Sequence, residues 1–193
     1  MRTLVVFAHP VETSFAAALH KAVVENLTAG GHEVDDCDLY AEGFNPVLSR
    51  EERLNYHDVD ACTAPVQGYV DRLRAAEALV LNFPVWNFGY PAILKGFFDR
   101  VFLPGVSFRL AHGRTWPNLH NIRKLGAVVT YGGDRWRARL MGDPPRKVVK
   151  RAVRAVVHPT AKMRYLALYD MNRNSHAVCS AFLDKVSQEM KAF

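Results

Sequence analysis

The segment AHPVETSF, residues 8–15, places a histidine and two hydroxyl side chains where a helix is expected to begin. Thr13 or Ser14 can cap that helix, and the unpaired N–H groups of its first turn favour an anion such as a phosphate. His9 can donate to the same anion, and Phe15 follows the cap. The segment has neither G-x-G-x-x-G nor the G-K-S/T of a P-loop, which argues against nucleotide hydrolysis. Taken alone, it favours a capped helix with a loop histidine over a binding site.

A second segment, FPVWNFGYP at residues 83–91, combines backbone constraint with flat side chains. Its prolines and glycine restrict the chain, while Trp86, Phe88 and Tyr90 offer ring faces. Such a loop can aim peptide groups and rings at a planar heterocycle. The alternative interpretation is that Trp86 and Phe88 are ordinary core or interface aromatics.

A third segment, VVTYGGD at residues 128–134, ends an apolar run in two glycines. Gly132 and Gly133 permit close approach of the backbone to a ligand, and their amides can stabilise negative charge. A glycine pair after a strand fits an ordinary turn equally well. The argument for a ligand site comes from three such segments meeting at one place.

The pattern of the chain predicts that meeting place. Short apolar runs alternate with helical periodicity five times, which indicates an α/β domain with a parallel sheet covered on both faces. We expect one domain over residues 1–193, a three-layer sandwich with strand order 2-1-3-4-5. Ligands bind such sheets beyond the carboxyl ends of the strands, so residues 9–15, 84–90 and 130–134 converge. The predicted strands are 3–8, 32–39, 78–83, 125–130 and 163–169, and the predicted helices are 13–28, 65–77, 91–103, 146–157 and 175–190. Residues 41–64 form a long connection with one short helix at 50–55.

Composition excludes several classes of protein. The chain has 193 residues, of which 49% are hydrophobic, so it can bury a sizeable core. No apolar run approaches the roughly 20 residues of a membrane span, and we expect no stable membrane insertion. A first strand at residue 2 or 3 leaves no room for a signal peptide, so a cytoplasmic location is expected. The three scattered cysteines, Cys37, Cys62 and Cys179, predict neither a disulfide framework nor a metal site.

Four stretches of the chain resemble a known family. They are TLVVFAHPVETSF, LYAEGFNPVLSREE, FPVWNFGYPAILKGFFDRVFLPG and VTYGGD. They look like the NAD(P)H:quinone oxidoreductase (DT-diaphorase-like) branch of the flavodoxin-like superfamily, in register over about residues 2–133. The resemblance implies a flavodoxin-like fold with a non-covalent flavin at the strand ends. It places the flavin phosphates and ribityl chain against His9, Thr13, Ser14 and Phe15. It places the ring along Pro84, Val85, Trp86, Asn87 and Phe88, with its N1/O2 edge at Thr130, Tyr131, Gly132 and Gly133.

The resemblance also implies an activity. Hydride passes from NAD(P)H to the flavin N5 and then to a quinone or similar small acceptor, by a ping-pong mechanism. No side chain acts as a nucleophile, and Tyr131 and Asn87 are candidate supporting groups. The long connection after the second strand, kept here, favours FAD, with FMN as the alternative. Members are usually homodimers, for which Phe88, Phe108 and Trp116 are interface candidates.

Two departures from the family pattern concern the acceptor pocket. The best-known members carry a tyrosine and a histidine downstream of the glycine pair, whereas residues 134–147 here contain neither. If protons are relayed, another group or water must do it. Tyr131 stands where the family often has threonine, and the bulkier ring is expected to narrow the pocket.

The positive charge of the chain is concentrated in one segment. The net charge is +6, but residues 135–154 carry eight basic residues and one acid, so the other residues sum to −1. The segment can be solvated surface, or Arg135, Arg137 and Arg139 can bind the pyrophosphate or 2′-phosphate of the dinucleotide. A nucleic-acid contact is the third interpretation, but no nucleic-acid motif accompanies the charge, and we expect no such partner.

Two other functions fit the same fold. One is a regulatory subunit of a potassium efflux system, in which the basic surface would meet an acidic partner. The other is a one-electron carrier of the flavodoxin type, although such carriers are typically acidic and have a Thr/Ser/Gly-rich phosphate loop that residues 9–15 do not match.

Overall fold

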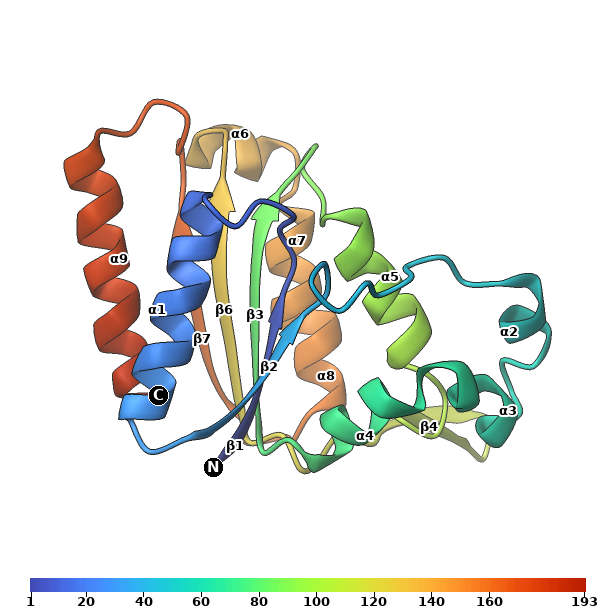
Figure 1. The fold of residues 1–193 in the computed structure, drawn as a ribbon. Coiled ribbons are helices and arrows are strands. Elements are labelled where there is room, and N and C mark those ends of the chain that lie inside the picture. The colour runs from blue at the N-terminus through green and yellow to red at the C-terminus, as the bar shows by residue number, and fades with distance from the viewer.

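The computed structural model describes residues 1–193 and has a parallel sheet at its centre (Figure 1). The strand order is β2-β1-β3-β6-β7, and every neighbouring pair is parallel. Counting these five strands along the chain, this is the predicted order 2-1-3-4-5, so the flavodoxin-like fold is confirmed. The strands are Arg2–Phe7 (β1), Glu33–Asp38 (β2), Ala78–Val85 (β3), Lys124–Tyr131 (β6) and Lys162–Leu168 (β7).

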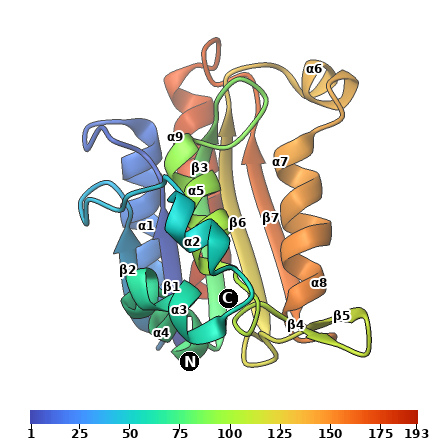
Figure 2. The ribbon, with the colours of Figure 1, turned by 90° about the vertical axis from the view of Figure 1, so that its right-hand side faces the viewer.

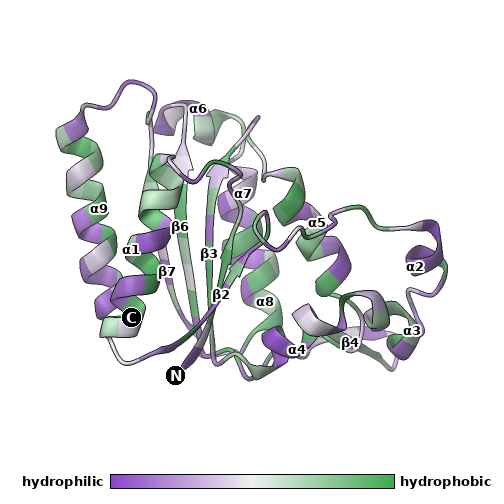
Figure 3. Ribbon diagram, viewed as in Figure 1, coloured by the Kyte–Doolittle hydropathy of each residue, from purple (hydrophilic) through white to green (hydrophobic).

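Helices cover both faces of the sheet, as Figures 1 and 2 show. Alternate side chains of β3 lie on opposite faces of the sheet, with Leu79 and Leu81 in one apolar cluster and Ala78 and Val80 in the other. Apolar residues gather in the strands and on the helix sides that face them (Figure 3). One face carries α1 (Phe15–Ala29) and α9 (His176–Lys191). The other carries α4 (Gln67–Ala75), α5 (Ala92–Val101) and a continuous helix made of α7 (Pro144–Lys147), a π-helical stretch (Val148–Val153) and α8 (Arg154–Val156). None of these helices is both long enough and apolar enough to cross a membrane.

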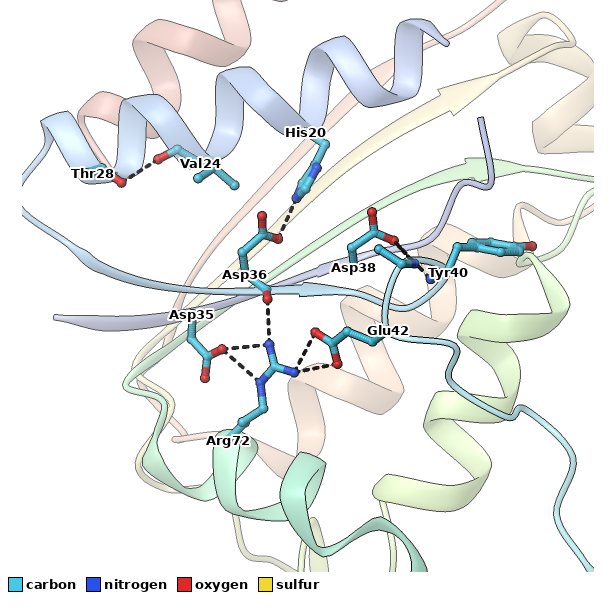
Figure 4. A network of polar contacts seen from close by, with 10 residues as sticks. His20, Val24, Thr28, Asp35, Asp36, Asp38, Tyr40, Glu42 and Arg72 are labelled. Atoms are coloured by element: carbon cyan, nitrogen blue, oxygen red, sulfur yellow. Dashed lines mark hydrogen bonds and ion pairs between the residues drawn. The ribbon is translucent and has the colours of Figure 1, made fainter. Parts of the chain in front are cut away.

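The polar strand β2 lies at the sheet edge, as its sequence predicts. Arg72 of α4 donates to Asp35 of this strand at 2.9 Å and to both oxygens of Glu42, in the turn after it, at 2.8 Å. On the other side of the strand, the Nε2 of His20 from α1 lies 2.8 Å from Asp36 (Figure 4). These contacts hold the edge strand between two helices.

The long connection after β2 is more ordered than expected. It contains α2 (Arg50–Leu54), which confirms the predicted short helix, and also α3 (Val59–Thr63), which was not predicted. Ser49 and Glu52 form a reciprocal cap at the start of α2. Glu52 is then buried against Arg100 of α5, whose Nε donates to it at 2.8 Å.

Four further features were not anticipated. An antiparallel hairpin, β4 (Phe108–Ala111) with β5 (Arg114–Pro117), follows α5, and a short helix, α6 (Arg135–Leu140), follows β6. Pro91 is the cap that precedes α5, rather than its first helical residue. Strands β3 and β6 each extend further than predicted at their carboxyl ends, β3 by Pro84 and Val85 and β6 by Tyr131. These three residues therefore belong to strand ends, not to loops.

A candidate flavin site at the carboxyl rim

The carboxyl ends of β1, β3, β6 and β7 lie at one end of the sheet (Figures 1 and 2). The last residues of β3 and β6 and the segments after β1, β3 and β6 include all the residues singled out for chemistry. We call this end the rim. The N-terminal ends of α1 and α6 lie beside the rim. The rim therefore contains free backbone amides, together with aromatic rings and charged groups.

The first part of the rim is the start of α1. Ser14 is the cap, and its hydroxyl accepts the N–H of Ala17 at 3.1 Å. The N–H groups of Phe15 and Ala16 make no hydrogen bond within the chain, and Thr13 is exposed just before them. This helix start has open amides and the positive end of a 15-residue helix dipole. It can therefore hold a phosphate.

His9 is fixed beside those amides. Its Nδ1 accepts the N–H of Val11 at 3.1 Å and lies 3.0 Å from the Ser14 hydroxyl. Because Nδ1 accepts, the proton of the neutral ring is on Nε2, which is left as a donor. The ring meets Trp86 edge-on, with centroids 5.7 Å apart. His9 thus connects the first segment of the rim to the second.

The second part of the rim is a tight hairpin turn after β3. Trp86 and Gly89 exchange backbone hydrogen bonds of 3.2 and 2.8 Å, and the two residues between them have positive φ, 48° at Asn87 and 58° at Phe88. This is a type I′ turn, which normally has glycine in the second central position. Phenylalanine there is strained, and strain of this kind concentrates at functional sites.

A hollow of about 240 Å³ lies between this turn and the end of β6. Val85, Asn87 and Phe88 form one side, and Tyr131 with the glycine pair forms the other. The N–H groups of Gly132 and Gly133 make no hydrogen bond within the chain. A side chain at position 132 would begin 3.1 Å from the amide of Asn172. The absence of a side chain there keeps the hollow open and its amides accessible.

The wall of the hollow is a buried tyrosine network. Tyr131 is 3% exposed, and its hydroxyl donates to Asp143 at 2.7 Å, so Tyr165, also 2.7 Å away, must donate to Tyr131. Tyr169 stacks on the ring with centroids 4.4 Å apart. Burial, with further contributions from Tyr165 and Asp143, raises the pKa of Tyr131 well above its usual range. The phenol therefore stays neutral and acts as a fixed wall.

These features fit the flavin that the resemblance implies. The hollow is smaller than the roughly 300–1,000 Å³ of pockets that enclose a whole drug-sized ligand, which suits part of a ligand such as its ring. The amides of residues 132 and 133 suit an electron-rich ring edge, and the start of α1 suits a phosphate tail. The structure brings the three predicted segments to one rim.

The arginines predicted for dinucleotide phosphate do not all lie together. Arg135 and Arg139 line a second hollow beside α6. Arg137 points elsewhere and pairs with Asp134, which also caps α6. The spacing of a helix explains the split, because residues two apart face different directions.

Sequence reasoning missed two residues of the rim. Asn172 follows β7 and lines the first hollow. It could have been found, because the last parallel strand must end at the same rim as the others. Asp143, the acceptor for Tyr131, has a left-handed backbone (φ 46°) before α7. Its contact with a tyrosine twelve residues away had no signal in the sequence.

Comparisons with known proteins agree with this geometry. A family model described as flavodoxin-like fold matches residues 1–163. NAD(P)H dehydrogenase (quinone) 1 of Rattus norvegicus is 35% identical over an alignment 148 residues long, which covers 68% of this chain and 54% of that protein. The crystal structure of Smu.1420 from Streptococcus mutans matches with a TM-score of 0.87 and 31% identity, over 100% of both chains. The NAD(P)H:quinone oxidoreductase from Methanothermobacter marburgensis has a TM-score of 0.81 over 99% of this chain and 98% of that one, at 23% identity, and supports the fold alone.

The curated relatives are longer than the region they share with this chain. The matched part of the chain spans between about half and two thirds of their length, at 54%, 65% and 66% for three of them. The likeness therefore covers the domain that carries the rim, and not the whole of those proteins.

Proposed function

The chain belongs to the family of proteins with the flavodoxin-like fold, and from this premise we propose that it is a flavin-dependent NAD(P)H dehydrogenase that reduces quinones or similar small acceptors. The observation that carries the proposal is the rim itself. Open amides at a helix start, a strained aromatic turn and a hollow lined by two glycines all lie along one edge of the sheet. Relatives named for NAD(P)H and quinone support the substrate classes.

The chemistry supplied by a bound flavin is hydride transfer, taken from NAD(P)H and given to the acceptor in alternate steps. The protein binds and orients. In this proposal His9, Thr13, Ser14 and the amide of Phe15 hold the phosphate end of the cofactor. The residues from Pro84 to Phe88 lie along the ring. The amides of Gly132 and Gly133, with Thr130 and Tyr131 behind them, stabilise negative charge at the ring edge.

Tyr131 positions the site and does not donate protons in this proposal. Its hydroxyl proton is committed to Asp143, and burial raises its pKa far above neutrality. The side chain of Asn87 is exposed at the mouth of the hollow, where it can hydrogen-bond a substrate. Any proton that the reaction needs comes from water or from a group at this mouth.

We favour FAD over FMN because the long connection between β2 and β3 is retained, as in the FAD-binding relatives that the sequence resembles. Assembly as a homodimer belongs to the same proposal. Its predicted interface residues do not form one patch, since Phe88 lies at the rim and Phe108 and Trp116 lie on the hairpin near the opposite end of the sheet (Figure 2). The exposed rings of Trp86 and Phe88 at the rim support an interface there.

The experiment that tests the proposal uses the purified protein. Flavin released by heat is identified by mass, and the oxidation of NADPH and NADH is followed with menadione as the acceptor. We expect one flavin per chain, identified as FAD, and parallel lines in double-reciprocal plots at several menadione concentrations. A protein that takes up neither FAD nor FMN would contradict the proposed function.

A further inference from the structure

A second hollow, of about 190 Å³, lies beside α6 at the rim, and its lining is strongly basic. Five residues line it: Arg135, Arg139, Asp143, Arg146 and Tyr169. None of the three arginines forms an ion pair with a carboxylate of this chain, since the nearby acids are engaged elsewhere. Asp134 pairs with Arg137 and Arg173, and Asp170 pairs with Arg173.

The single carboxylate inside the hollow does not balance this charge. Asp143 uses one oxygen to accept the Tyr131 hydroxyl, and three guanidinium groups face one acid. Like charges gathered in a concave surface repel one another, and a bound anion relieves that repulsion. Arginine is also the side chain best suited to phosphate, because its planar fork donates two parallel hydrogen bonds.

One of the three guanidinium groups, that of Arg146, is already fixed in position by neighbouring tyrosines. Arg146 donates from Nη1 to the Tyr169 hydroxyl at 3.2 Å, and its Cζ lies 5.1 Å from the centre of the Tyr165 ring. Both tyrosines belong to the network that also fixes Tyr131. Binding an anion therefore costs less side-chain entropy at Arg146 than at a freely moving surface arginine.

The two hollows share a wall. α6 presents Ala138 to the first hollow and Arg135 with Arg139 to the second. Tyr131 lines the first hollow, and its hydroxyl reaches Asp143 in the second. A ligand that places a ring against the first hollow is thus close to the arginines of the second.

We propose that this second hollow binds a phosphate group of the nicotinamide dinucleotide, with Arg139 and Arg146 as its principal ligands. The proposal deepens the proposed function and rests on it for the identity of the dinucleotide. It replaces the predicted trio of Arg135, Arg137 and Arg139, because Arg137 is turned away and Arg146 takes its place. The group bound is either the 2′-phosphate or the diphosphate, which share the chemistry that the arginines recognise.

The test is calorimetric titration of the purified full chain with 2′,5′-ADP and with 5′-ADP. Arg139→Gln and Arg146→Gln are each expected to weaken, about tenfold, the binding of the nucleotide that carries the recognised phosphate group, which is the loss typical of one charge-assisted hydrogen-bond pair. Arg151→Gln is the matched control, because it removes the same charge from the same segment at an exposed position outside the hollow. We expect it to change the affinity less than twofold.

The two nucleotides distinguish the two phosphate sources. A loss confined to 2′,5′-ADP identifies the 2′-phosphate, and the KM for NADPH then rises in both variants while that for NADH does not. A loss with 5′-ADP, which has the diphosphate but no 2′-phosphate, identifies the diphosphate. Unchanged affinities in Arg139→Gln and Arg146→Gln, or an equal loss in Arg151→Gln, would overturn the proposal.

Two controls distinguish a failure of this inference from unfolding of a variant and from a failure of the proposed function. Arg139 is exposed and its side chain makes no hydrogen bond or ion pair within the chain, so its variant decides the question even if Arg146→Gln unfolds. Flavin content is measured on the same samples. A chain without flavin contradicts the proposed function, whereas a chain with flavin and unaltered variant affinities contradicts only this inference.

Discussion

The connection after β2 and the segment after β6 both contain charged side chains, but the two segments differ in whether those charges are paired within the chain. In the first, Glu52 is buried against Arg100 and shielded from water. In the second, Arg135, Arg139 and Arg146 surround a hollow with one acid that is already engaged. Charges satisfied inside the chain hold the fold together, whereas charges left unsatisfied at a rim are available to a ligand. The difference separates a structural connection from a segment that we propose binds a ligand.

The electrostatics of Glu52 agree with a structural role. Burial alone would raise the pKa of Glu52, but the amide of Ser49 and the guanidinium of Arg100 outweigh it and hold the pKa below its usual value. Arg100 also donates to the carbonyl of Asn45. One arginine thus ties the start of the connection and its first helix to α5.

The largest effect is expected from breaking that buried pair. Glu52→Ala leaves Arg100 buried without its partner and should lower the free energy of unfolding by about 3–5 kcal/mol. Urea denaturation of the two proteins gives the difference. Glu51→Ala, at the exposed neighbouring position, is the control and should stay within about 0.5 kcal/mol of the original. Equal losses of unfolding free energy in the two variants would mean that the Glu52–Arg100 pair stabilises the fold no more than an exposed glutamate does.

The next effect concerns how closely the same connection packs on α5. A Cβ added at Gly96 would lie 2.3 Å from the backbone oxygen of Pro46. Gly96→Ala should therefore destabilise the protein by about 1–3 kcal/mol, despite the better helix propensity of alanine. Gly68→Ala provides the contrast, because nothing lies within 4 Å of its added Cβ, and it should stabilise α4 by about 0.4–1 kcal/mol. A neutral Gly96→Ala would show that the connection is loosely attached.

A smaller effect on stability is expected on the functional side. Tyr131→Phe removes the donor to Asp143 and the acceptor for Tyr165, at a cost of about 1–3 kcal/mol, eased by the partial solvent access of Asp143. Because the ring still forms the wall of the first hollow, we expect flavin affinity to change less than threefold. Fluorescence titration checks the affinity, and a loss of flavin binding by the folded variant would show that the hydroxyl itself is required.

The smallest change in the free energy of unfolding is expected when the pH is lowered mildly. The pKa of Glu52 is lower in the folded chain than in the unfolded one, where it is about 4.3. Its charged form therefore stabilises the fold above that value, and the contribution is lost as the pH falls through the folded pKa. The difference in unfolding free energy between the protein and Glu52→Gln should stay constant from pH 7 to about pH 5 and shrink below. A difference that grows on acidification would contradict this sign.

The strands and main helices could be predicted because their signals are local. Runs such as Leu125–Thr130 are apolar and β-branched, and Ser14 caps its helix as expected. The hairpin of β4 and β5 was missed although His112 and Gly113, both with positive φ, form a recognisable two-residue turn between them. The turn at Asn87 and Phe88 was harder to predict, because phenylalanine stands where glycine normally marks such a turn.

The candidate site was predictable in its position and not in its contacts. Parallel topology brings the strand ends together, so the three segments from His9, Pro84 and Thr130 had to meet. The bond from Tyr131 to Asp143 and the stacking of Tyr165 on Arg146 depend on how α7 packs against β7, which no local pattern encodes. Tyr131, whose ring is expected to narrow the pocket, is held in the wall of the first hollow by these contacts.

The most direct test of the account is flavin binding by the purified chain, compared between Trp86→Ala and Trp116→Ala. Both residues are exposed tryptophans, at 41% and 45%, but only Trp86 lies at the rim. Base–aromatic stacking suggests a loss of about 1–3 kcal/mol in flavin affinity for Trp86→Ala and almost none for Trp116→Ala. Equal flavin affinity in the two variants, or no flavin binding by the original protein, would contradict a flavin site at this rim.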